Sequence, residues 1–441
     1  MQDKGRGIRM WVCLIFGALS LSCAAVEASV RPADKPGMVV VVEAGDYESR
    51  GHKVRVPQTT ELHVYGPNEV FVKSEAHVLT NEKPAAYHGG TALARTLGPI
   101  DTGTRLLFAI RPESVMVHSE SDGGIVYDEG KDYFLDRDWG GVSRVDGGRI
   151  TEGQRVFVDY GVHLQRVDLV QVSADGRPSI KQGSAAAVCA QTPEPDTDCT
   201  ALATVYVPYR CRSITEDNIC PMPGKNLTWK QFVSVGGQEY LAHTIGLLHA
   251  GKPVSIVCWG DSVTQGASAS SPEKSYVGLF RTRLKDMYPR SSIEVLNAGI
   301  GGSNTDSRRD GYEREVLSYK PDLITVEFVN DVGKPAETIK SNWAEFITKA
   351  RAANPNVEFI LITPHFLTPP WMGSFQVSVD TMREAAAGNK VALADTTRIW
   401  ESLRGLGIPY ETLLANGLNH PNDLGHEFFA ESLIQLLRPR R

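Results

Sequence analysis

The sequence lacks three features that would each point to a particular class of protein. Beyond the N-terminus it has no apolar stretch long enough to cross a bilayer, which argues against an integral membrane protein. It has no excess of basic residues: the formal net charge is −6 and no basic stripe stands out, which argues against a nucleic-acid binder. It has no CxxC pair, and no histidine lies within its main cysteine cluster, which disfavours a structural zinc site.

The seven cysteines fall into three groups by position. Cys13 and Cys23 lie in the N-terminal segment, and Cys258 lies in an apolar run where it is expected to pack as a small hydrophobic side chain. The remaining four lie close together in the chain: Cys189, Cys199, Cys211 and Cys220. In an exported protein such a group predicts two local disulfides. Cys189–Cys199 and Cys211–Cys220 is the nearest pairing, although spacing does not determine connectivity.

The N-terminus has the pattern of a signal peptide covering residues 1–28. Three basic residues precede the apolar run 10–21, and small residues suited to cleavage follow it, up to Ala28. This pattern predicts an exported protein, periplasmic or secreted. Two alternatives stay open, namely a retained N-terminal anchor and a lipoprotein acylated on Cys23.

The first half of the mature chain is expected to be a β domain covering residues 29–235. A length of 441 residues predicts two or three domains, and 41% hydrophobic with 22% charged residues is typical of soluble globular proteins. Short alternating apolar runs are separated by turn sequences such as Asp122-Gly-Gly, a pattern typical of all-β sandwiches and barrels. The clearest strand candidates are 38–42, 61–65, 105–110, 155–160 and 203–208.

Residues 236–441 alternate between strand and helix patterns, which predicts a three-layer α/β/α domain around a parallel sheet. Several strand candidates are continuous apolar runs, as expected for a sheet that helices cover on both faces. The predicted strands are 254–258, 293–297, 323–328, 358–362 and 391–395. The predicted helices are 275–288, 308–319, 339–353, 379–387 and 424–437.

Ser262 is the first candidate functional residue. The apolar run 254–259 leads into Gly260-Asp261-Ser262, so this serine follows the carboxyl end of a predicted parallel strand, where α/β proteins bind their ligands. A serine hydroxyl is a weak nucleophile. It needs a base to take its proton and donors to stabilise the oxyanion. Alone, Gly-Asp-Ser is also a common turn sequence.

Three later segments supply groups of that kind. Gly302 follows the second predicted strand, where a glycine lets a backbone N–H approach a ligand closely. Asn330 follows the third strand, and its side-chain amide can donate to an oxyanion. His420 precedes the last helix on a turn that Pro421 restricts, and it can act as general base and then as general acid. Taken singly, each is as easily an ordinary turn or cap.

Together the four segments resemble the SGNH, or GDSL-like, hydrolase superfamily over roughly residues 250–441, in the family's order. The resemblance implies that Ser262 is the nucleophile and His420 the base. It also implies an oxyanion hole made of the backbone N–H groups of Ser262 and Gly302 and the side chain of Asn330. No metal or organic cofactor is implied.

The chain departs from the family pattern at the residue that orients the histidine. The family usually has an Asp three residues before that histidine, but this chain has Gly417 there and Asn416 one position earlier. Three explanations stay open. A backbone carbonyl orients His420 in a Ser–His dyad, which we expect; another acid substitutes; or the protein is a degenerate, weakly active member. The candidate acids are Asp423, Asp331 and Asp306.

Other polar and aromatic residues near these segments are expected to have structural roles. His426 lies in the first turn of the last helix, near an expected Asp423 cap, and is predicted to pack or cap. His365 follows the fourth strand in a loop whose aromatic residues Phe366 and Trp371 are expected to line the pocket. The aromatic stretch 133–140 is interpreted as core and turn, with a surface platform as the alternative.

The resemblance implies a serine esterase that works through an acyl-enzyme. Exported family members with an added β domain are often carbohydrate O-acetylesterases, so an acylated glycan is the first expectation, and an acylated small molecule the second. The alternatives are a short-chain lipolytic esterase or thioesterase, and a non-catalytic carbohydrate-binding protein on the same fold. No nucleic-acid partner and no membrane span are expected, and the sequence leaves the oligomeric state open.

Overall fold

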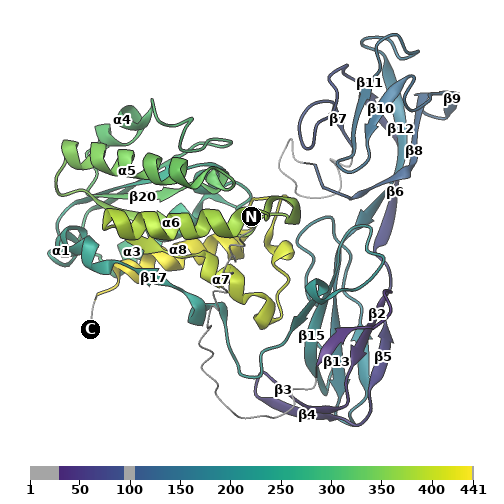
Figure 1. The fold of residues 1–441 in the computed structure, drawn as a ribbon, viewed down its shortest axis with the longest axis horizontal. Coiled ribbons are helices and arrows are strands. Elements are labelled where there is room, and N and C mark those ends of the chain that lie inside the picture. Colours follow the sequence, from purple (N-terminus) through teal and green to yellow (C-terminus); the bar gives the residue numbers. More distant parts are fainter. Residues whose placement is uncertain (1–28, 94–104, 440–441) are drawn as a thin grey trace, which may run out of the picture.

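The computed structural model describes residues 29–93 and 105–439, in which a β region is joined to an α/β domain. Figure 1 shows the two parts side by side, with the long β region on the right and the helix-covered sheet on the left. The predicted signal peptide and Cys23 lie outside the described residues. Among the helices that the described residues form, none has the length and apolar character needed to span a membrane.

The β region contains two separate hydrophobic cores. In the first, a three-stranded antiparallel sheet shares its core with a four-stranded antiparallel sheet. The strands of these sheets are β1 (Val30–Pro32), β2 (Val39–Val42) and β5 (Thr60–His63), and β14 (Pro178–Lys181), β13 (Arg166–Ser173), β15 (Cys199–Val207) and β16 (Ile219–Pro221). A hairpin of β3 (Gly45–Ser49) and β4 (His52–Val56) adds Tyr47 and Val56 to this core.

The second core lies farther along the β region, at the top right of Figure 1. It packs between a four-stranded sheet and a small three-stranded sheet. The strands are β6 (Asn68–Val78), β12 (Arg155–Leu164), β8 (Ile110–Glu120) and β9 (Gly123–Val126), and β10 (Tyr133–Asp136), β11 (Gly141–Arg144) and β7 (Thr91–Ala92). The expectation of a β-rich, sandwich-like region is therefore confirmed.

One predicted strand of the β region is wrong. Residues 105–109 form an irregular turn segment, and the strand β8 begins only at Ile110. Arg105 explains the difference, because its buried guanidinium donates to the carbonyl oxygens of Ala86 (3.0 Å) and His88 (3.1 Å) and so ties this segment to a neighbouring turn. Leu106, Leu107 and Ala109 are buried by packing rather than by strand pairing, whereas Phe108 is 40% exposed.

The α/β domain is built on a six-stranded sheet in the order β17-β22-β21-β20-β18-β19. All five predicted parallel strands are present, as β18 (Val254–Gly260), β19 (Ile293–Gly299), β20 (Leu323–Glu327), β21 (Glu358–Ile362) and β22 (Ala392–Ala394). The edge strand β17 (Val235–Gly236) is antiparallel and was not predicted, since two residues show no periodicity. It spans the expected boundary between residues 235 and 236.

Helices cover both faces of this sheet, which confirms the three-layer architecture (Figure 1). Alternate residues of β18 point to opposite faces. Ile256 and Cys258 pack under α1 (Ala242–His249), α3 (Tyr276–Met287) and α8 (Asp423–Leu437). Val257 and Trp259 pack under α5 (Ala336–Ala353) and α6 (Phe375–Asn389). Because strands β18 to β22 are parallel, their carboxyl ends meet at one edge of the sheet.

Two local predictions in the α/β domain differ from the structure, and short helices occur that were not predicted. The predicted helix 308–319 is reduced to α4 (Tyr312–Glu315) and a short 3-10 turn, because the buried Arg308 donates to the carbonyls of Gly260 and Ala298 (both 3.1 Å) and holds its segment against the sheet edge. The N-cap of α8 is Asn422, whose side chain accepts from the Gly425 N–H at 3.1 Å, and not Asp423. The short helix α7 (Thr397–Ser402) was not predicted.

The predicted disulfides are wrong: the cysteines in the described residues are all free thiols. Cys199 begins strand β15, and Cys220 lies in β16, where it pairs with Thr204 of the same sheet. Cys189 lies 4.0 Å from the Asn422 side chain of the α/β domain, and Cys211 lies 3.9 Å from the sulfur of Met38. A disulfide needs Cα atoms within about 7 Å, and the fold sends these neighbours in sequence to different places.

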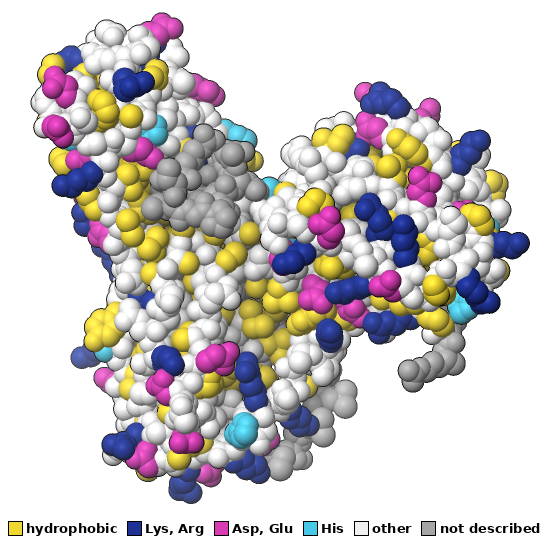
Figure 2. Space-filling view, turned by 180° about the vertical axis from the view of Figure 1, so that it is seen from behind, with side chains coloured by type: hydrophobic (Ala, Val, Ile, Leu, Met, Phe, Trp, Pro, Cys, Tyr) yellow, Lys and Arg dark blue, Asp and Glu magenta, His cyan; other side chains and the backbone are white. Residues whose placement is uncertain are grey.

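The β region and the α/β domain are in direct contact. The buried Thr204 hydroxyl of β15 donates to the Gly407 carbonyl (3.0 Å), and Arg404 donates to the Ile219 carbonyl of β16 (3.1 Å). Seen from behind, a notch separates the upper β region from the α/β domain, and acidic and basic side chains are interspersed over the surface (Figure 2).

Candidate active site

Ser262 lies at a tight strand-to-helix junction. Strand β18 ends at Gly260, and Ser262 begins the short helix α2 (Ser262–Gln265) rather than the loop that the sequence suggested. A Cβ atom at Gly260 would lie 2.0 Å from the Thr264 hydroxyl and 2.2 Å from the Glu327 carbonyl, so glycine is required there. Asp261 caps the helix by accepting from the Val263 N–H at 3.0 Å. This geometry holds Ser262 at the sheet edge, lining a pocket.

His420 lies beside this serine: its Nε2 is 3.0 Å from the Ser262 Oγ. The loop that carries it is organised by one side chain, because the Oδ1 atom of the buried Asn416 accepts from three consecutive backbone N–H groups. These are the N–H groups of Leu418 (3.0 Å), Asn419 (2.9 Å) and His420 (2.9 Å). Asn416 therefore has a role in the site that the sequence analysis did not assign.

His365 supports the same loop from behind. Its Nε2–H donates to the Asn419 carbonyl at 2.8 Å, and the Thr368 N–H donates to the Leu418 carbonyl at 2.8 Å. Burial lowers the pKa of His365 to about 3, so its ring stays neutral. The ring does not line the pocket; of the aromatic residues expected there from this loop, Trp371 does, whereas Phe366 packs against Phe375.

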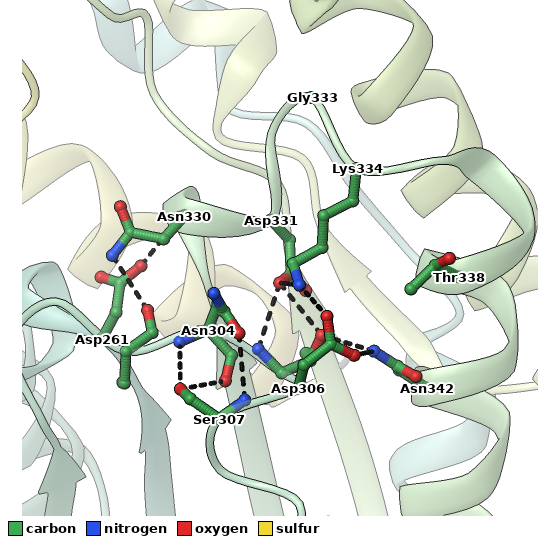
Figure 3. A network of polar contacts seen from close by, with 12 residues as sticks. Asp261, Asn304, Asp306, Ser307, Asn330, Asp331, Gly333, Lys334, Thr338 and Asn342 are labelled. Atoms are coloured by element: carbon green, nitrogen blue, oxygen red, sulfur yellow. Dashed lines mark hydrogen bonds and ion pairs between the residues drawn. The ribbon is translucent and has the colours of Figure 1, made fainter.

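Gly302 and Asn330 line the same pocket as Ser262 and His420. The Asn330 backbone N–H donates to Asp261 at 3.0 Å, a contact that Figure 3 shows. The Asn330 side chain donates one N–H to the Ser303 carbonyl at 2.9 Å. A side-chain amide has two N–H bonds, so one stays available to a ligand. Within the part of the chain that the structure describes, no group accepts from the backbone N–H of Ser262 or Gly302.

Each of the three candidate acids bonds to other residues of the domain. Asp423 accepts from the backbone and hydroxyl of Ser270 (both 2.7 Å) and from Lys274 (2.9 Å). Asp331 accepts from the backbone and hydroxyl of Thr305 at 3.1 and 3.0 Å. Asp306 is paired with Lys334 and bonded to Asn342, and Figure 3 shows this network. The expected Ser–His dyad stays a prediction.

Two buried carboxyl groups behind the serine were missed by sequence reasoning. Asp261 joins the serine turn to the Asn330 turn, and burial raises its pKa to about 7. Glu327, at the end of β20, accepts from the Thr264 hydroxyl (2.9 Å) and the Val329 N–H (3.0 Å). Burial, with the neighbouring Asp261, raises the pKa of Glu327 well above its ordinary value. Their position at strand ends, beside the Gly-Asp-Ser turn, is the signal that could have found them.

His426 has a structural position. Its Nδ1 accepts from the Tyr276 N–H (3.3 Å) and its Nε2–H donates to the Ala267 carbonyl (3.1 Å), so both ring nitrogens are used. Burial lowers its pKa to about 4 and keeps the ring neutral. Across residues 29–93 and 105–439, no group of three His, Cys, Asp or Glu side chains is close enough to hold a metal ion.

The pocket in front of Ser262 has a volume of about 890 Å³. Its described lining includes no Asp, Glu, Lys or Arg. Five side-chain amides line it instead, together with two aromatic rings, Tyr87 from the β region and Trp371 from the α/β domain: the amides are those of Gln265, Asn304, Asn330, Asn416 and Asn419. The described lining thus has no acidic, Lys or Arg side chains, combines amides with apolar residues such as Val332 and Leu367, and comes from both parts of the chain.

Comparison with known proteins gives the family of this domain. Residues 258–428 match the GDSL-like Lipase/Acylhydrolase family. The α/β domain belongs to that family. The match covers the serine junction, the segments that carry Gly302 and Asn330, and the histidine loop, and it ends within α8.

Relatives of this GDSL-like protein are distant. It is 29% identical over 109 residues to the uncharacterized lipoprotein YqeF of Bacillus subtilis (strain 168), which covers 22% of this chain and 43% of that protein. It is 23% identical over 208 residues to an acetylxylan esterase of Geobacillus stearothermophilus, which covers 42% of this chain and 94% of that enzyme. Among solved structures, a two-domain esterase (CEX) active on acetylated mannans has a TM-score of 0.40 and 24% identity. That match covers 45% of this chain and 52% of the esterase. The chain thus spans about half the length of that structure and less than half of the lipoprotein.

Proposed function

We propose that this protein is a serine esterase in which Ser262 is the nucleophile and His420 the general base. The observation that carries the proposal is the 3.0 Å contact between Ser262 Oγ and His420 Nε2 at the floor of a pocket. The N–H groups of Ser262 and Gly302 and the amide of Asn330 border the same space, where an oxyanion would form.

The reaction balances with these groups alone. Ser262 Oγ bonds to the acyl carbon while its proton passes to His420 Nε2, and the departing hydroxyl takes that proton as its bond to the acyl carbon breaks. Water then attacks the acyl-enzyme, His420 takes a proton from it, and the released acid leaves Ser262 restored. Asp261 contributes by holding the serine turn and the Asn330 turn at fixed separation.

The substrate that fits the pocket best is an acetylated carbohydrate. The described lining combines amides, aromatic rings and small apolar side chains and has no Asp, Glu, Lys or Arg, which suits a neutral ligand with both hydroxyl groups and C–H surfaces. A coenzyme A thioester carries phosphates that call for basic residues, and a long acyl chain calls for a continuous apolar wall. The similarity to an acetylxylan esterase supports the same substrate class. The N-terminal pattern of residues 1–28, and similarity to a lipoprotein, support export.

Hydrolysis of p-nitrophenyl acetate tests the proposed activity. We expect Ser262→Ala to lower kcat/KM by about 10³-fold or more, because acyl transfer loses its nucleophile. Ser341→Ala, on the outer surface of α5, is the matched control and should behave as wild type. If wild type and Ser262→Ala hydrolyse the ester equally, the esterase proposal is wrong and a non-catalytic carbohydrate-binding role takes its place.

A substrate panel tests the acyl group and the carbohydrate. We expect wild type to prefer p-nitrophenyl acetate over the octanoate, and to release acetate from acetylated xylan or mannan. A preference for octanoate would support the lipolytic alternative, and a preference for acetyl coenzyme A would support the thioesterase alternative.

A further inference from the structure

Three aromatic side chains that the proposed reaction does not use meet at the mouth of the pocket. Tyr87 and Trp139 come from the β region, and Trp371 comes from the α/β domain. The ring centroids of Trp371 lie 5.5 Å from Tyr87 and 6.4 Å from Trp139, and those of Tyr87 and Trp139 lie 6.0 Å apart. We refer to these three residues as the aromatic cluster.

Each ring of the aromatic cluster is carried by a stiff turn. Tyr87 lies at the tip of a turn closed by two backbone hydrogen bonds between Ala85 and His88, and Arg105 donates to the carbonyls on either side of it. The Trp139 N–H donates to the Asp136 carboxylate at 3.1 Å. Trp371 follows two prolines, and its N–H donates to the Thr368 carbonyl at 2.9 Å. The rings are therefore pre-organised, which lowers the entropy cost of binding a ligand.

The aromatic cluster is not a hydrophobic core. Tyr87 keeps 37% of its surface exposed, and Trp139 and Trp371 are only partly buried. Tyr87 and Trp371 line the same pocket as Ser262, together with side-chain amides and with apolar residues such as Val332 and Leu367. The alternative of a surface platform for the stretch 133–140 thus fits Trp139, whereas Tyr133 and Leu135 are buried in the second β core.

We propose that the aromatic cluster is a subsite that binds a pyranose ring of a glycan chain, next to the acylated sugar held at Ser262. The faces of a pyranose ring carry C–H groups that pack against aromatic rings, and its hydroxyl groups bond to side-chain amides. A pocket of about 890 Å³ is larger than an acetyl group needs, and it leaves room for neighbouring sugars. This inference rests on the proposed function for the position of the acylated sugar, but not for the binding of the glycan.

Binding of unacetylated oligosaccharides tests the subsite without requiring catalysis. We expect the full-length protein to bind xylopentaose or mannopentaose in isothermal titration calorimetry, and Trp371→Ala and Tyr87→Ala each to raise Kd about tenfold or more. Trp371→Phe should raise Kd less than Trp371→Ala does, because phenylalanine keeps an aromatic face. Tyr319→Ala, which removes an aromatic side chain outside the pocket lining, should bind as wild type. Absence of binding by wild type, or unchanged Kd in both alanine variants, would overturn the inference.

Kinetics then separate a subsite from a purely structural contact between the two parts of the chain. We expect Trp371→Ala to lower kcat/KM for an acetylated xylo-oligosaccharide about tenfold more than for p-nitrophenyl acetate. Equal losses on the two substrates would mean that the rings only hold the domains together, and the inference would fall. If wild type hydrolyses neither substrate but binds the oligosaccharide through Trp371 and Tyr87, the proposed function fails and the subsite stands.

Discussion

At the residue scale, the Asn416 side chain holds the backbone of the loop that carries His420. One buried oxygen accepts from three consecutive N–H groups, which closes the loop from residue 416 to residue 420. Buried backbone donors left without acceptors are costly, so the loop has a strong preference for this conformation. The proposed base is thus held in place through its backbone, in addition to the contact with Ser262.

We predict that Asn416→Ala lowers both stability and activity. Three N–H groups lose their shared acceptor, so the free energy of unfolding should fall by about 2–3 kcal/mol, and kcat on p-nitrophenyl acetate should fall about tenfold or more. Asn416→Asp keeps an acceptor oxygen in the same place and should retain more of both. Urea denaturation and steady-state kinetics measure the two effects, and equal losses in the Ala and Asp variants would contradict this role for Oδ1.

At the element scale, the loop that carries His420 packs against the β region at Gly417. This is the position at which the family usually has an Asp. Gly417 has a φ of +69°, and a Cβ atom there would lie 2.7 Å from the Leu106 side chain of the β region. A residue with a side chain is strained in this conformation and also meets a neighbour. The loop conformation and the β region together explain why glycine occupies this position.

We predict that Gly417→Asp does not improve activity, although it restores the residue type of the family pattern. The left-handed conformation and the contact with Leu106 should lower the free energy of unfolding by about 1–2 kcal/mol and displace His420, so kcat/KM should fall. Gly405→Ala, in an open position without positive φ, is the control and should stay close to wild type. A rise in kcat/KM for the Asp variant would refute this account.

At the scale of the whole molecule, burial of carboxyl groups beneath the site makes stability depend on pH. The pKa values of Asp261, Glu327 and Asp331 are all raised, in each case chiefly by burial, and that of Asp331 reaches about 6. The unfolded chain loses these protons near pH 4 to 5, whereas the folded protein keeps them to higher pH. Between about pH 4.5 and pH 7 the folded state binds more protons, so these groups lower the free energy of unfolding as pH rises.

We predict that Glu327→Gln flattens this dependence. Glutamine can still accept from the Val329 N–H and can donate to Thr264, so the fold should be kept. Removing one titrating group should reduce the loss of stability with pH by up to about 1.4 kcal/mol per pH unit. Urea denaturation from pH 5 to pH 8 measures the slope for wild type, for Glu327→Gln and for the exposed control Glu294→Gln. A slope in Glu327→Gln as steep as that of wild type would show that Glu327 does not titrate in this range.

The two parts of the chain together form one pocket. Leu106 packs at the histidine loop, and Tyr87 reaches the wall opposite Ser262, both from the β region. Contacts such as Thr204 with Gly407 hold the parts together. The β region therefore forms part of the pocket wall, and is not an appendage to the α/β domain.

Local patterns were enough to predict most of the elements and five of the residues that line the pocket, Trp371 among them. Apolar runs of strand length located the five parallel strands, because a buried parallel strand is apolar on both faces. The carboxyl ends of such strands meet at one edge, so Ser262, Gly302 and Asn330 were predicted to lie together, and His420 before the last helix could reach them.

Contacts between distant residues decided the rest. The two cysteines of each predicted pair have different neighbours in the fold, and the three candidate acids bond to partners that no spacing in the sequence identifies. The roles of Asn416 and Asp261 and the meeting of Tyr87 with Trp371 depend on how loops pack against one another. Periodicity and motifs report on neighbours along the chain, whereas these features are set by packing between segments separated by tens to hundreds of residues.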